Sequence, residues 1–121
     1  WAVSLTYSTS TTMKLTIENG IFYIDNKRYC YAKVNEDGSK DVRSGARKVS
    51  TQYSHHHKPD GRVLPLVDGL GWITDEPSGA ICIGSVLGAN GPLKCAMSLS
   101  GLVARIEACE DVGKTVTLEI K

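Results

Sequence analysis

Apolar and polar residues alternate with a period of two along several short stretches of the chain, which is typical of half-buried β-strands. Met13 to Ile17 alternates strictly and is followed by Asn19-Gly20, a dipeptide that favours a two-residue hairpin turn. Ile21 to Ile24 is expected to form the second strand of this hairpin, and Asp25-Asn26 gives a second turn signal. Lys27 to Val34, which is rich in tyrosine, is expected to form a third strand. The pattern predicts a three-stranded meander.

The same signals continue through the rest of the chain. Further strands are predicted at Arg47 to Tyr53, Val63 to Val67, Leu70 to Ile73, Ala80 to Leu87 and Lys114 to Ile120. Asp68-Gly69 marks a hairpin turn, and Pro65, which lacks a backbone N–H, indicates that its strand lies at a sheet edge. The nearly unbroken apolar run from Ala80 to Leu87 predicts a strand that is buried on both faces.

The segment from Leu93 to Cys109 fits two different structures. Its apolar residues recur at helical spacing from Leu99 to Ile106, yet those from Leu102 to Ala108 also alternate as in a strand. Ser100-Gly101 would interrupt a helix at a cost of about 1 kcal/mol, and carboxylates crowd the end at which the helix dipole disfavours them. We therefore predict two strands around Ser100-Gly101, with a helix as the alternative.

These elements define the expected fold: mainly β, a small single-domain barrel or sandwich of antiparallel strands, with at most one short helix near residues 97–110. The domain is expected to span residues 13–121, and residues 1–12 are expected to form an extended N-terminal arm. In an extended strand, four apolar side chains of the arm share one face: Trp1, Val3, Leu5 and Tyr7. Because an isolated strand is not ordered in water, we predict that these side chains contact another subunit or a larger assembly.

The composition argues against several kinds of partner and chemistry. Among 121 residues, 14 are Lys or Arg and 13 are Asp or Glu, and neither sign forms a long block. This balance predicts neither nucleic-acid binding nor attachment to a membrane. The sequence contains no nucleophile elbow, no phosphate-binding glycine loop and no H-E-x-x-H zinc motif. We therefore expect no enzymatic activity, no catalytic residue and no cofactor.

Three consecutive histidines, His55 to His57, precede turn-forming residues and are expected at the exposed lip of a loop. Only His55 and His57 would point the same way in an extended strand, so they are the one candidate metal pair, whereas a catalytic zinc usually has three protein ligands. The run resembles the start of zinc peptidases that trim peptidoglycan, in which an aspartate follows the histidine by seven residues. That spacing leads to Arg62, Val63 and Leu64, none of them a carboxylate. We expect no metal site here.

The four cysteines are Cys30, Cys82, Cys95 and Cys109. They form no C-x-x-C pair and lie in partly apolar surroundings, so we expect free thiols that pack as small apolar residues. If all four were oxidised, three pairings would be possible, and the sequence does not choose among them. Disulfides would indicate a secreted protein, and free thiols a virion or intracellular protein.

From Arg47 onward, the order of the glycine-spaced segments "DGRVLPLVDG", "GAICIGSVLG", "KCAMSLSGLVARIEA" and "DVGKTVTLEI" resembles that of the small β-rich proteins that decorate bacteriophage heads. The resemblance implies a non-enzymatic structural protein that stabilises a capsid and anchors through an N-terminal arm. Its partners would then be proteins, either its own subunits in a homo-oligomer or a larger assembly. A small secreted binding module, such as a toxin, inhibitor or carbohydrate binder, is the alternative, and a His-dependent zinc peptidase is a more distant one.

Overall fold

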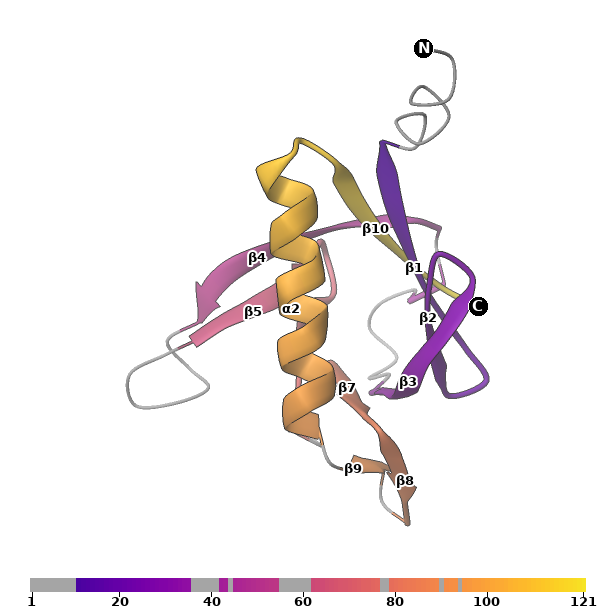
Figure 1. Ribbon diagram of the computed structural model, residues 1–121. Coiled ribbons are helices and arrows are strands. Elements are labelled where there is room, and N and C mark those ends of the chain that lie inside the picture. Colours follow the sequence, from indigo (N-terminus) through magenta and orange to yellow (C-terminus); the bar gives the residue numbers. More distant parts are fainter. Residues whose placement is uncertain are drawn as a thin grey trace.

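The structure is a computed structural model that describes residues 11–35, 42–43, 45–54, 62–76, 79–89, 91–93 and 95–121, apart from the side chain of Cys95. Within these residues, strands close into a barrel in the order β1-β10-β4-β5-β6-β7-β3-β2. The barrel strands are β1 (Thr12–Glu18), β2 (Ile21–Ile24), β3 (Lys27–Val34), β4 (Arg47–Ser54), β5 (Arg62–Val67), β6 (Gly71–Thr74), β7 (Ile81–Gly84) and β10 (Thr115–Ile120). A two-stranded sheet, β8 (Val86–Gly88) with β9 (Gly91–Leu93), and helix α2 (Cys95–Asp111) complete the described elements (Figure 1). The expected mainly β fold with at most one helix is confirmed, and of the two expected architectures, barrel or sandwich, it is the barrel.

Most neighbouring strands of the described barrel are antiparallel, as predicted, but two pairs are parallel. Strand β1 pairs with β10 in parallel, from Thr12 opposite Thr115 to Ile17 opposite Ile120. Strands β6 and β7 form the other parallel pair, with Ile73 opposite Ile81. The first and last described strands are therefore direct neighbours, and their pairing closes the barrel (Figure 1).

The predicted meander is confirmed as β1, β2 and β3, and both of its turns have the required backbone. Asn19 and Gly20 have φ angles of 53° and 78°, and Asp25 and Asn26 have φ angles of 49° and 68°. Two consecutive positive φ angles are the geometry of a type I′ turn, which matches the twist of the flanking strands. Asp25 also accepts a hydrogen bond from the backbone N–H of Lys14 at 2.9 Å, which fixes the second turn to β1.

The core lies inside the barrel and under α2. Inward-facing side chains of nearly every barrel strand are buried, among them Leu15, Phe22, Val49, Leu64, Ile73, Ile83 and Leu118. Leu99, Leu102 and Ile106 of α2 belong to the same apolar cluster. The helix lies against β7, β4, β5 and β10 and covers this core (Figure 1).

The prediction of two strands around Ser100-Gly101 is wrong, because this segment is the middle of α2. The helical alternative buries Leu99, Leu102 and Ile106 together, which alternating strands would not do. Tertiary contacts also remove the objection to carboxylates at the helix C-terminus. Glu110 accepts hydrogen bonds from Thr51 of β4, one from the hydroxyl and one from the backbone N–H at 3.3 Å.

The end of α2 is a Schellman motif, a signal that the sequence contained. Gly113 has a φ of 78°, and its N–H donates to the carbonyl of Glu110 at 3.1 Å. The N–H of Lys114 donates to the carbonyl of Cys109 at 2.8 Å. This pair of bonds satisfies helix carbonyls that would otherwise lack partners and directs the chain into β10.

Two further predictions about strands are wrong. Pro65 does not lie at a sheet edge, because β5 is paired with β4 on one side and with β6 on the other. Strand β6 pairs only with Leu66 and Val67, so Pro65 lies beyond the paired part of that side, where a missing N–H costs little. The apolar run from Ala80 to Leu87 is buried only as far as Gly84.

Candidate functional site

The sequence-predicted contact residues Trp1, Val3, Leu5 and Tyr7 lie outside the described residues, as do His55 and His57. The predicted contacts of the arm and the expectation of no metal site at His55 and His57 therefore stay predictions. Within the described part of the chain, no group of three or more His, Cys, Asp and Glu side chains is placed to hold a metal ion.

The cysteines that the structure describes are free thiols. Cys30 and Cys82 are buried, as predicted, and Cys109 is half-buried with its Sγ atom 3.8 Å from Sδ of Met13. Cys82 is paired across the sheet with Thr74, which is also buried. These thiols pack as small side chains, and they do not come together in a cluster with other potential ligands.

The clearest candidate interaction surface is the sheet formed by β8 and β9, which we call the β8–β9 ribbon. The chain bends at Ser85 after β7, and the ribbon projects away from the barrel, past the start of α2 (Figure 1). Val86 faces Leu93 across the ribbon, and Leu87 faces Pro92. Val86, Leu87 and Leu93 are 40%, 61% and 53% exposed, although each is a large apolar residue.

Close approach of backbones holds the ribbon in place. A side chain at Gly84 would overlap the backbone of Leu93, so β9 can cross the end of β7 only because residue 84 is a glycine. A side chain at Gly88 would come within 2.7 Å of Leu93 Cδ1, so the leucine side chain lies over this glycine. The ribbon is therefore fixed against the barrel by its base, where Pro92 is buried, while Val86, Leu87 and Leu93 stay exposed.

The chemistry of the ribbon is that of an apolar contact surface. No charged residue occurs between Ile81 and Leu93, although 22% of the whole chain is charged. Met97, in the first turn of α2, is 87% exposed and adds a further apolar side chain shortly after β9. Sequence reasoning missed this surface because an apolar run is normally buried, and the signal that could have revealed it is the glycine spacing in Gly84-Ser85-Val86-Leu87-Gly88.

Comparison with known proteins gives no assignment. The chain matches no known protein family, and searches of curated proteins and of solved structures find no match. Within the described residues, no helix combines the length and the apolar character that crossing a bilayer requires.

Proposed function

We propose that this chain is a non-enzymatic assembly protein that associates with a second copy of itself through the β8–β9 ribbon. The observation that carries the proposal is the exposure of Val86, Leu87 and Leu93 on an element that projects from the barrel. Large apolar side chains grouped on a projecting element mark interaction sites more often than singly scattered ones do.

A second copy is the favoured partner because the residues of the ribbon carry no charge. In a two-fold interface a surface meets itself, so any charged side chain at its centre meets its own like charge. The stretch from Ile81 to Leu93 brings no charge of its own, and the cation shown beside it is Lys33 of β3, which lies next to Gly91. In addition, β8 and β9 are each paired on one edge only among the described strands, and Pro92 removes an N–H from β9. The edge of β8 is therefore the better one to continue the sheet into a partner.

Decoration of a capsid is the specific form of assembly that the resemblance to phage head proteins implies. Part of that resemblance, "GAICIGSVLG", forms β7 and β8. In this form the homo-oligomer would add to a virion, and Trp1, Val3, Leu5 and Tyr7 of the N-terminal arm would provide a second contact. A secreted binding module remains the alternative class.

The test is the oligomeric state of the full chain and of a Leu87→Lys variant, measured by sedimentation velocity over a concentration series. Burial of one leucine side chain is worth about 1.5–3 kcal/mol, and a two-fold interface contains it twice. The substitution should therefore raise the dimer Kd by roughly 100-fold or more. The matched control is Val112→Lys, which changes an apolar residue that is 71% exposed in the turn after α2.

The expected result is that wild type and Val112→Lys associate, whereas Leu87→Lys is shifted to monomer with an unchanged circular-dichroism spectrum. A wild-type protein that stays monomeric at every concentration would overturn the proposal. Equal association of wild type and Leu87→Lys would overturn it too, because the contact would then lie elsewhere on the molecule.

A further inference from the structure

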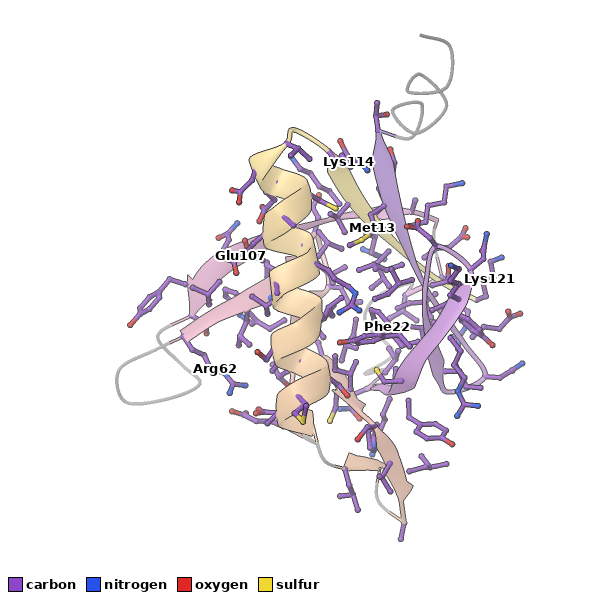
Figure 2. The ribbon with its side chains drawn as sticks, in the orientation of Figure 1. Met13, Phe22, Arg62, Glu107, Lys114 and Lys121 are labelled. Atoms are coloured by element: carbon purple, nitrogen blue, oxygen red, sulfur yellow. The ribbon has the colours of Figure 1, made fainter. Side chains whose placement is uncertain are left out.

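A second surface feature, separate from the β8–β9 ribbon, is a cleft of about 390 Å³ between α2 and the start of β5. One wall is formed by helix residues, and the other by Arg62, Val63 and Leu64 together with Asp75. Figure 2 shows Arg62 at the start of β5 and Glu107 on α2, both on the same side of the helix. The volume suits a small organic molecule.

The cleft is hollow because the helix presents small side chains to it. Ala96, Ser100 and Ala104 are four residues apart, so they lie one above another along the helix and leave room between α2 and β5. Leu64 and Leu99 line the cleft but are almost fully buried, so the exposed Val63 and the half-buried Val103 supply most of its accessible apolar surface. A ligand with an aliphatic body can therefore lie against the helix here.

The cleft lining has more negative than positive charge. Arg62 is held in a bidentate ion pair with Asp75, with Nη1 3.0 Å from Oδ2 and Nη2 2.5 Å from Oδ1. Both side chains of this pair are mostly buried, at 19% and 28% exposure. Glu107 forms no hydrogen bond or ion pair with any residue that the structure describes, so its carboxylate is available to a ligand. The lining thus carries one cation against two carboxylates.

We propose that this cleft binds a small primary alkylamine, with its chain against Val63, Val103 and Ala104 and its ammonium group at Glu107. A carboxylate in a partly apolar cleft forms a charge-assisted hydrogen bond with an ammonium group, which is stronger than a bond between neutral groups. An anionic ligand would meet Glu107 unfavourably. Both Nη atoms of Arg62 are engaged by Asp75, and its Nε atom, which has no hydrogen-bond partner among the described residues, is buried. The site is therefore selective for cations that have an apolar body.

The experiment is a titration of the ¹⁵N-labelled full chain with n-hexylamine, followed by amide chemical shifts in ¹H–¹⁵N spectra. Hexanol and hexanoate have the same chain length without charge and with the opposite charge, so they separate the apolar contribution from the electrostatic one. We expect hexylammonium to bind with a Kd of roughly 1 mM, as suits its size. The shifts should be confined to residues 62–64, 75 and 96–107, and hexanoate should bind at least about tenfold more weakly.

Two variants test the named contacts. Glu107→Gln should weaken hexylammonium binding about tenfold, whereas Glu119→Gln, an exposed carboxylate on β10, should leave it unchanged. Ala104→Met fills the cleft at an exposed helix position with another good helix former, so the fold is kept and binding should be lost. Equal binding of hexylammonium and hexanoate, shifts spread over the whole barrel, or unchanged binding by Glu107→Gln would each overturn the proposal. The β8–β9 ribbon takes no part in this test, so its outcome leaves the association experiment independent.

Discussion

Gly101→Ala should destabilise the protein, although alanine is the better helix former. Gly101 lies in the middle of α2, where alanine would normally gain about 1 kcal/mol. A Cβ atom at this position would lie only 2.5 Å from the hydroxyl oxygen of Tyr29. That hydroxyl donates a hydrogen bond of 2.7 Å to the carbonyl of Ser98, and the Tyr29 ring packs edge-on against Phe22 with centroids 6.2 Å apart. The phenol therefore cannot move away without straining this hydrogen bond or the contact with Phe22.

The magnitude follows from these contacts. Overpacking of this kind costs about 1–3 kcal/mol, and displacing the phenol also gives up a hydrogen bond worth about 0.5–1.5 kcal/mol. After subtraction of the gain in helix propensity, Gly101→Ala should lower the free energy of unfolding by roughly 0.5–3.5 kcal/mol. In a Tyr29→Phe background the nearest ring atom, Cζ, is 3.8 Å from the new Cβ, an ordinary van der Waals distance. There the same substitution should stabilise the protein by up to about 1 kcal/mol.

The assay is a double-mutant cycle measured by urea unfolding of wild type, Gly101→Ala, Tyr29→Phe and the double variant. We expect a coupling free energy of roughly 1.5–4.5 kcal/mol between the two positions, because the hydroxyl is the atom that the methyl group approaches most closely, whereas Arg105 Nη1, at 3.3 Å, is present in both backgrounds. If Gly101→Ala changes stability equally in both backgrounds, the close approach of α2 to Tyr29 is not what requires glycine, and the reasoning is refuted.

Three further predictions concern single positions. Gly20→Ala, at a φ of 78° in the first hairpin turn, should cost about 1 kcal/mol and lower the melting temperature, and an unchanged melting temperature would contradict the turn geometry. Gly84→Ala should lower the free energy of unfolding in urea by about 2 kcal/mol or more, because the methyl group meets the backbone of Leu93, which cannot rotate away as a side chain can. A variant as stable as wild type would show that the ribbon can shift freely. Burial raises the pKa of Tyr29, and the positive charge of Arg105 partly offsets this shift. The stability that the neutral phenol contributes is therefore complete below the ordinary phenol pKa of 10.0 and is lost as the pH rises through the raised pKa. Alkaline unfolding measured from pH 9 upward should therefore be less steep in Tyr29→Phe, and an identical pH dependence would argue against this ionisation.

Local sequence determined the parts of the fold that depend on neighbouring residues. Asn19-Gly20 and Asp25-Asn26 adopt positive φ angles because their small or polar side chains tolerate them, whatever packs around the turn. Strict alternation from Met13 to Ile17 places Met13, Leu15 and Ile17 in the core, since a strand exposes successive side chains to opposite faces. The mainly β class and the meander could therefore be predicted from the sequence, whereas the choice between a barrel and a sandwich stayed open.

Tertiary structure decided whether Leu93 to Cys109 is helix or strand. Gly101 suggested a break in a helix, but its partner is Tyr29, far away in the sequence, and it is glycine because two elements come close together there. Glu110 suggested an unfavourable helix end, but Thr51 of β4 supplies its hydrogen bonds. Each of these residues has a local preference that a distant contact overrides, and a single sequence does not contain that contact.

The candidate functional surfaces also depend on where the chain leaves the barrel. Ile81 and Ile83 are buried, whereas Val86 and Leu87 are exposed, although all four belong to one apolar run. The difference arises at Gly84 and Ser85, where pairing with β3 ends and the chain forms its own short sheet with β9. The hydrophobic pattern shows how apolar each residue is, whereas the burial of a residue depends on which strand lies beside it. Only the tertiary structure could therefore separate the core part of this run from the part that faces solvent.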